Sequence, residues 1–142
     1  MVPKFRAYIK DLDEFEYNDI PHKGHFVYGN LIKGGLNYDV DAIVGNLIEI
    51  TDEYVNAEWW KSIKKGSAEQ STGLKDANGK EIYEDDVLKN PKYRSVVKFG
   101  SGSFYADVIG AVNRFPLAGE WQTSVVIGNV HTNPELLEAQ HD

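Results

Sequence analysis

Four carboxylates lie close together in the sequence, at Glu81, Glu84, Asp85 and Asp86. Paired carboxylates can support acid–base hydrolysis or hold Mg²⁺, provided that their oxygens converge in a pocket. Acids this close in sequence, at the foot of a predicted hairpin, fan outward instead, and Asp86 is placed to accept hydrogen bonds from backbone N–H groups. We therefore expect a structural role for the block and assign no catalytic residue. A hydrolase that uses Glu84 and Asp86 is the least favoured alternative.

Histidine and glycine spacings give only weak signals for metal or phosphate binding. His22 and His25 could supply two metal ligands, with Glu16 or Asp19 nearby, but a site needs three or four convergent groups. The Gly-Ser-Gly at 100–102 lacks the GxGxxG spacing of a phosphate-binding loop and lies between two predicted strands. The sequence contains no GxSxG or HExxH motif. We expect no metal, no cofactor and no enzymatic activity.

Aromatic side chains suggest two possible interaction surfaces. Trp59 and Trp60 are adjacent, so on a strand they point to opposite faces, one toward the core and one outward. An exposed tryptophan is a candidate interface anchor, and core packing of both is the alternative. The second surface combines Tyr105 with Arg94 and Lys98, a pattern that could stack on single-stranded nucleic acid and neutralise its phosphates.

Composition limits these choices. The 142 residues carry 15 Lys and Arg against 22 Asp and Glu, and the net charge of −7 opposes broad binding to a phosphate backbone. The absence of cysteine excludes disulfides and thiolate sites. No stretch is long and apolar enough for a membrane span, and the N-terminus lacks the apolar region of a secretory signal. We expect a soluble, cytoplasmic protein.

The segments that would position these groups are mainly short β-strands. Segment 51–66 fits either a helix or a strand, and we favour a strand over 57–63. Asn78-Gly79 predicts a hairpin with a type I′ turn. Alternating and apolar patterns predict the other strands, over residues 4–9, 25–32, 36–40, 42–50, 93–100, 103–110 and 123–130.

Two further features concern the ends of elements. The block of acids predicts a kink between a strand that ends at Tyr83 and one that starts near Asp86. Asn133 and Pro134 fit the N-cap and first position of a short C-terminal helix over 133–139.

Together these elements predict a single, mainly β domain with two lobes. A β-rich N-terminal lobe covers about 1–66. The C-terminal lobe, about 71–131, has some five antiparallel strands with tight turns, which is the size of an SH3-like small barrel, and the terminal helix follows it.

Three blocks of the sequence together resemble one protein family. They are Phe5-Arg6-Ala7-Tyr8, the stretch QSTGLKDANGKEIYEDDV at 70–87, and VIGN at 126–129 with NPELL at 133–137. In order and spacing they resemble the YopX family, small proteins encoded by bacteriophages and prophages. The sequence departs at Ser71, where the family usually has an aromatic residue, and at Asp85, where it usually has a glycine. A positive φ at Asp85 is tolerable for aspartate, at some cost relative to glycine.

The resemblance implies a β-rich fold, a mobile-element origin in a bacterial host and a tendency to self-associate. It implies no activity and transfers no functional residue. We therefore expect a phage or prophage accessory protein that acts as a homo-oligomeric binding or scaffold module, with Trp59 and Trp60 as candidate interface residues. Its expected partners are further copies of the chain and an unidentified host or phage protein. The alternative is a nucleic-acid-binding small β-barrel that uses Arg94, Lys98 and Tyr105.

Overall fold

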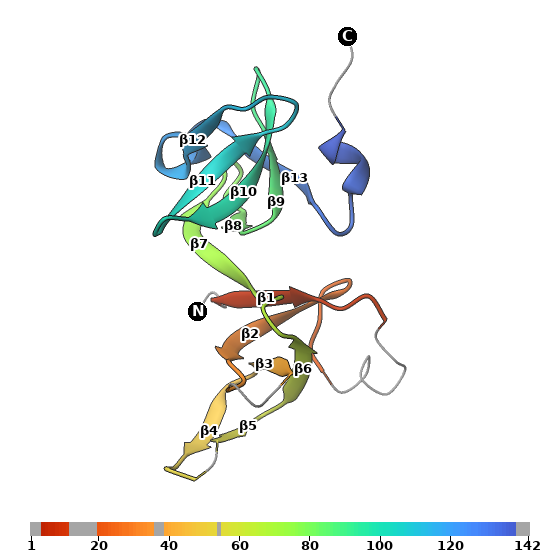
Figure 1. Ribbon diagram of the computed structural model, residues 1–142, viewed down its shortest axis with the longest axis vertical. Helices are drawn as coiled ribbons and strands as arrows, with labels where there is room; N and C mark the ends of the chain where they lie inside the picture. Colours follow the sequence, from red (N-terminus) through yellow and green to blue (C-terminus); the bar gives the residue numbers. More distant parts are fainter. Residues whose placement is uncertain (1–3, 12–19, 36–38, 54, 139–142) are drawn as a thin grey trace. The chain divides into compact units, whose positions relative to one another are not determined.

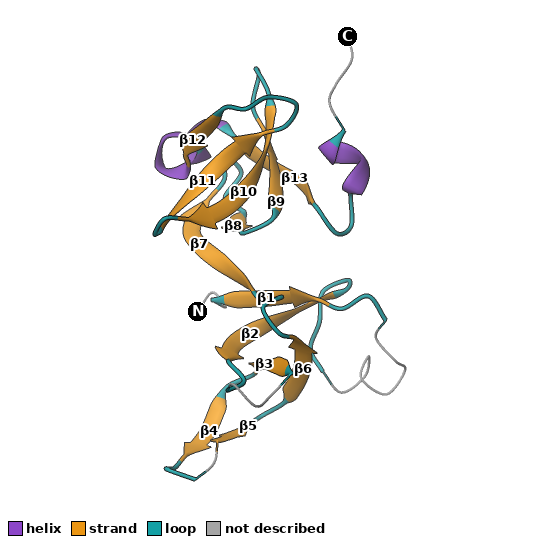
Figure 2. Cartoon of the chain, viewed as in Figure 1, coloured by secondary structure: helices purple, strands orange, loops and turns teal. Residues whose placement is uncertain are grey.

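The computed structural model describes residues 4–11, 20–35, 39–53 and 55–138 and divides into two compact units, Met1–Gln70 and Ser71–Asp142. Antiparallel strands build both units (Figures 1 and 2). Within the described ranges, the helical segments are three short 3₁₀ helices, all in the second unit. The prediction of a mainly β fold is confirmed.

The first unit is a sheet with the strand order β6-β3-β2-β1-β7. Alternation along the strands directs Ala7, Val27, Ile43 and Ile63 into a buried cluster, against which Phe5 and Ile9 pack as their spacing predicts. The strands of this sheet are β1 (Phe5–Tyr8), β2 (Phe26–Ile32), β3 (Val40–Val44), β6 (Trp60–Lys64) and the first residues of β7 (Glu69–Lys75). Of the strand predicted over 36–40, residues 36–38 lie outside the described ranges.

Gly45 interrupts a segment that the sequence predicts as one strand over 42–50. β3 ends at Val44, and β4 (Leu47–Ile50) pairs with β5 (Val55–Ala57) in a hairpin that extends from the β3–β6 pair (Figure 1). The Trp59 indole fills the space that a side chain at position 45 would need, and the Gly45 N–H donates to the Trp59 carbonyl. The strand favoured over 57–63 is therefore present in two parts, which belong to β5 and β6. The break between these two strands lies opposite the break between β3 and β4.

The second unit is a sheet with the strand order β12-β11-β10-β9-β13, packed over a cluster of Ile82, Leu88, Val97 and Leu117. The later residues of β7 pair with β8 in a hairpin beside it. The elements are β8 (Glu81–Tyr83), β9 (Asp86–Lys89), β10 (Arg94–Gly100), β11 (Ser103–Val108), β12 (Arg114–Pro116), η1 (Leu117–Gly119), η2 (Trp121–Thr123), β13 (Val125–Asn129) and η3 (Pro134–Leu137).

This sheet is open, which corrects the expectation of a closed barrel. Its two edge strands, β12 and β13, do not pair with each other in the described part of the chain. β12 ends at Pro116, which lacks the N–H that a further ladder bond requires. On the β13 side, the N–H of Val126 donates to the Asp76 carboxylate and the carbonyl of Ser124 accepts from Ala77. The SH3-like character of the fold remains a prediction.

The hairpin predicted at Asn78-Gly79 is present, but the prediction of a type I′ turn is wrong. Gly79 has a φ of 82°, whereas Asn78 is not among the residues with positive φ. The Gly79 N–H donates to the Asp76 carbonyl, as in a type I turn that is followed by a glycine in the left-handed region. Two consecutive positive φ angles occur instead at Ser101 (53°) and Gly102 (81°), between β10 and β11.

The predicted kink is confirmed, because β8 ends at Tyr83 and β9 begins at Asp86. Asp85 lies between them with a φ of 68°, in the region that favours glycine. Its Oδ1 is 2.8 Å from Lys98 Nζ. Asp86 is buried, and its Oδ2 accepts the Tyr83 N–H at 2.8 Å, as the sequence predicts.

Asp85→Ala is expected to lower the free energy of unfolding by about 1 kcal/mol, because it removes the partly exposed ion pair with Lys98 and keeps the strained φ. Asp85→Gly loses the same pair but relieves the backbone strain, so its stability should lie above that of Asp85→Ala and close to that of the wild type. Urea unfolding followed by tryptophan fluorescence measures both, with Lys98→Met isolating the ion pair. An alanine variant as stable as the glycine variant would contradict the role of φ.

The predicted C-terminal helix is shorter and tighter than expected. It is the 3₁₀ helix η3, and Glu138 that follows it is already extended. Asn133 makes no side-chain cap, because its Oδ1 accepts the N–H of Asn129 instead. An isolated turn forms too few hydrogen bonds to offset the cost of helix nucleation, which accounts for the early end. Residue 139 lies outside the described ranges.

Candidate functional site

The two adjacent tryptophans lie on opposite sides of the first unit's sheet. Trp59 is partly buried and packs against the cluster that contains Ile43 and Ile63. Trp60 begins β6, pairs with Val44 and is 48% exposed. One of the two candidate interface residues therefore belongs to the core, and the other is available at the surface.

Trp60 borders an apolar hollow of about 320 Å³. The pairings Val44↔Trp60 and Ile32↔Ala42 put Ile32, Val40 and Ala42 on the same face as Trp60, because alternate residues of a strand share a face. Val40 is 45% exposed, so two large apolar side chains that line the hollow meet solvent. We call the residues Ile32, Val40, Ala42 and Trp60 the Trp60 patch.

Asp41 fixes the loops that border the Trp60 patch. Its Oδ2 accepts the Gly66 N–H and its Oδ1 accepts the Gly34 N–H, both at 2.9 Å. These two hydrogen bonds, the one from Gly66 first, lower the pKa of Asp41. Lys33 also lines the hollow and is exposed, so the rim of the patch carries positive charge.

The structure brings together only part of the proposed nucleic-acid patch. Lys98 and Tyr105 are cross-strand partners on β10 and β11. Burial opposes the charge of Lys98, but its hydrogen bond to Asp85 and the nearby carboxylates raise its pKa. The Arg94 guanidinium donates to the carbonyl of Glu138 at 2.8 Å. Both cations therefore already have acceptors within the protein.

The distribution of charge does not favour a polyanionic partner. Residues 1–70 contain 8 Lys and Arg against 12 Asp and Glu, and residues 71–142 contain 7 against 10. Neither unit thus has the excess of positive charge that drives counterion release from nucleic acid. Binding of nucleic acid through Arg94, Lys98 and Tyr105 remains a prediction.

The block of acids is distributed among separate partners. Glu81 accepts the Ser71 hydroxyl at 2.7 Å, Asp85 pairs with Lys98, and Asp86 accepts the Tyr83 N–H. None of these acids lines the Trp60 hollow or a second hollow beside β12. The arrangement matches a structural role, and a hydrolase that uses Glu84 and Asp86 stays the least favoured prediction.

The two histidines of the HxxH spacing bind backbone carbonyls. His22 Nδ1 contacts the Ile20 carbonyl and His25 Nδ1 contacts the Ile9 carbonyl, each at 2.9 Å. Because a carbonyl only accepts, each Nδ1 carries a proton and is not available as a metal ligand. Their sequence neighbours Glu16 and Asp19 lie outside the described residues.

Sequence reasoning missed two sets of residues that form these surfaces. Ile32 and Val40 join Trp60 through strand pairing across twenty residues or more, for which the sequence carries no signal. Arg114 lies on β12, a three-residue strand too short to show a period, and stacks on Tyr105.

No helix in the described part of the chain is long and apolar enough to cross a membrane. Among curated proteins, none matches this sequence. The crystal structure of protein EF1440 from Enterococcus faecalis is similar, with a TM-score of 0.56, 26% sequence identity, and coverage of 97% of this chain and 99% of that chain.

A match to the family described as YopX protein extends over residues 4–138. It includes all three blocks that resemble the family, namely 5–8, 70–87 and the C-terminal pair within 126–137. The chain therefore belongs to the YopX family.

Proposed function

We propose that this protein is a phage or prophage accessory protein without enzymatic activity, and that it works as a self-associating binding or scaffold module. The Trp60 patch carries the proposal, because it combines an apolar hollow with a tryptophan that is 48% exposed. Tryptophan at the centre of such a patch is the residue type most enriched among interface hot spots. The separate engagement of the acidic side chains described above supports the absence of a catalytic step.

A second copy of the chain is the proposed occupant of the patch. Self-association is the expectation that we drew from the sequence resemblance, and a two-fold interface brings the same patch of both copies together. The patch fits the apolar centre of such an interface, and Lys33 fits its polar rim. The net charge of −7 on each copy, and Lys33 where the two rims meet, repel between copies, so salt should strengthen the association by screening.

Trp60→Ala is expected to weaken self-association by about 2 kcal/mol, or roughly thirty-fold in dissociation constant, as for a central interface anchor. Sedimentation velocity over a range of protein concentrations measures the constant. Phe99→Ala is the matched control, because Phe99 is 45% exposed but lies in the other unit. It should leave the association unchanged.

Two outcomes would remove the proposal. One is a wild-type protein that stays monomeric at high micromolar concentration, and the other is a Trp60→Ala variant that associates like the wild type. The salt dependence separates partners: association of like-charged copies strengthens on going from low to high ionic strength, whereas binding to an oppositely charged partner weakens.

A further inference from the structure

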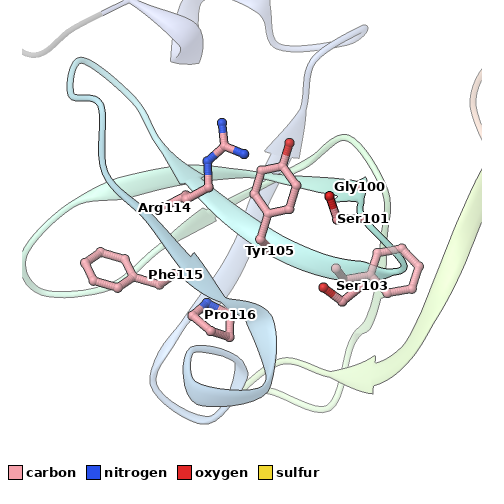
Figure 3. Close-up of a pocket in the computed structure, with 8 residues that line it drawn as sticks. Gly100, Ser101, Ser103, Tyr105, Arg114, Phe115 and Pro116 are labelled. Atoms are coloured by element: carbon pink, nitrogen blue, oxygen red, sulfur yellow. The ribbon is translucent and has the colours of Figure 1, made fainter.

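A second hollow, of about 330 Å³, lies within the unit Ser71–Asp142. The β10–β11 turn, β11 and β12 supply its lining, which consists of Gly100, Ser101, Ser103, Phe104, Tyr105, Arg114, Phe115 and Pro116. Figure 3 shows the side chains of Arg114 and Tyr105 extending side by side, while Phe115 points away from them. We call this the Arg114 hollow.

Strand pairing positions the guanidinium of Arg114. Asp107 pairs with Arg114 and Tyr105 pairs with Pro116, so Tyr105 and Arg114 share one face of the sheet. The guanidinium carbon of Arg114 is 4.6 Å from the centroid of the Tyr105 ring. This stack holds the planar guanidinium against the ring and leaves its N–H edges free to meet a ligand.

The polar side chains of the hollow are not engaged through hydrogen bonds or ion pairs by any other residue in the described ranges. Among the residues that the structure describes, neither a hydrogen bond nor an ion pair includes the guanidinium of Arg114 or the hydroxyls of Ser101, Ser103 and Tyr105. No carboxylate is among the residues that line the hollow, although Asp107, the cross-strand partner of Arg114 on β11, lies on the same face outside that lining. Its polar side chains are thus hydroxyls and one cation, a set suited to an oxyanion.

Two other cations of the unit, both on β10, differ from Arg114 in having acceptors. Lys98 pairs with Asp85, and Arg94 donates to the Glu138 carbonyl. Phe115, whose side chain points away from Arg114, is held by a stack on Tyr93 with ring centroids 5.6 Å apart. Tyr93 in turn donates its hydroxyl to Glu120 at 2.6 Å.

We propose that the Arg114 hollow binds a small ligand that carries a phosphate or carboxylate on an aromatic body. The oxyanion accepts from the guanidinium of Arg114 and from the neighbouring hydroxyls, in the bidentate geometry that arginine favours. The aromatic body packs against Pro116, on the same face as Arg114 and Tyr105. The volume lies at the lower end of the range of small-molecule sites, which limits the ligand to about the size of a mononucleotide. This site is independent of the Trp60 patch.

The test uses the full chain and four probes. Binding of each probe is monitored through the amide chemical shifts of residues 100–116. Phenyl phosphate and phenylacetate share an aromatic body and differ in the oxyanion, so together they distinguish a phosphate from a carboxylate ligand. Benzyl alcohol lacks the charge, and inorganic phosphate lacks the ring. We expect at least one aromatic anion to bind with a dissociation constant of about 1 mM or below, and both partial probes to bind at least about tenfold more weakly.

Variants assign the binding to Arg114. Arg114→Gln should weaken binding of the aromatic anion by about tenfold or more. Arg114→Lys should weaken this binding less, because lysine keeps the charge and loses only the planar guanidinium. Lys92→Gln removes an exposed charge outside the hollow and should change nothing. Unchanged amide shifts elsewhere in the unit show that each variant is folded.

Several results would overturn the proposal. One is that neither aromatic anion changes the amide chemical shifts at about 10 mM. The others are that Arg114→Gln binds the anion as tightly as the wild type does, or that benzyl alcohol binds as tightly as the aromatic anions. If inorganic phosphate binds as tightly as phenyl phosphate, the proposal that the ligand carries an aromatic body is wrong. Sedimentation of the same variants is expected to match the wild type, so failure here is distinguishable from failure of the Trp60 proposal.

Discussion

Arg6→Met is expected to lower the free energy of unfolding by about 3–5 kcal/mol, because it leaves the Glu69 carboxylate buried without its arginine. Arg6 and Glu69 are direct cross-strand partners on β1 and β7 and are only 4% and 3% exposed. Arg6 Nε donates to Glu69 Oε1 at 2.8 Å. The guanidinium also lies over the Phe26 ring, 4.4 Å from its centroid. The pair therefore fixes the position of β7 beside β1 in the first unit.

A double-mutant cycle separates the interaction energy of the Arg6–Glu69 pair from the cost of burying the two charges. Arg6→Met combined with Glu69→Met removes both charges, and we expect it to regain at least half of the loss, because a well-packed apolar pair avoids desolvation. Urea unfolding gives all four free energies. Lys10→Met likewise replaces a cation with methionine, at an exposed position, and should stay within about 0.5 kcal/mol of the wild type. A loss below about 1 kcal/mol for Arg6→Met would show that the pair is not needed.

Asp76→Ala is the second substitution with a large expected effect, a loss of about 2–4 kcal/mol. Asp76 is 5% exposed, and its Oδ1 accepts the N–H groups of Asn78 and Lys80 at 2.9 and 2.8 Å. Its Oδ2 accepts the Val126 N–H at 2.8 Å. One carboxylate thus closes the β7–β8 turn and ties it to β13, fifty residues away. Alanine leaves three backbone donors without this acceptor.

Asp76→Asn distinguishes hydrogen bonding from charge. The amide keeps one carbonyl oxygen, so we expect a smaller loss than for alanine. Lys80→Gln is the control, because it removes the adjacent charge and keeps the backbone N–H. Urea unfolding at neutral pH ranks the three variants. The role of the carboxylate would be refuted if Asp76→Ala were as stable as the control.

The pH dependence has a defined sign. Burial acts to raise the pKa of Asp76, but the hydrogen bonds from Val126, Lys80 and Asn78 outweigh it, so the folded pKa is lowered. A lowered folded pKa contributes stability that is present above the unfolded pKa of about 3.9 and is lost as the pH falls through the folded value. The stability gap between the wild type and Asp76→Asn should therefore narrow below about pH 4. A gap that is constant from pH 7 to pH 3 would assign the effect to packing alone.

Local features of the fold could be predicted because their causes are local. The kink between Tyr83 and Asp86 follows from acids that are unfavourable within a strand, and Asp86 itself accepts a backbone N–H three residues away. The positive φ of Asp85 could be expected from the glycine that the family usually carries there. The error at Asn78-Gly79 has a similar origin: Asp76 competes for the backbone N–H groups of the turn and selects a different turn type.

The sequence by itself determined that this chain is mainly β, where most of its strands lie and that it resembles the YopX family, because strand periodicity and turn chemistry act over a few residues. Only the tertiary structure decided that Arg6 is buried against Glu69, that Trp59 fills the space beside Gly45, and that the sheet beside β12 stays open. It also brought Arg114 onto Tyr105 and placed Val40 and Trp60 in the lining of one hollow. Each of these depends on which strands pair, and pairing is set by the burial of the whole sheet rather than by any short segment.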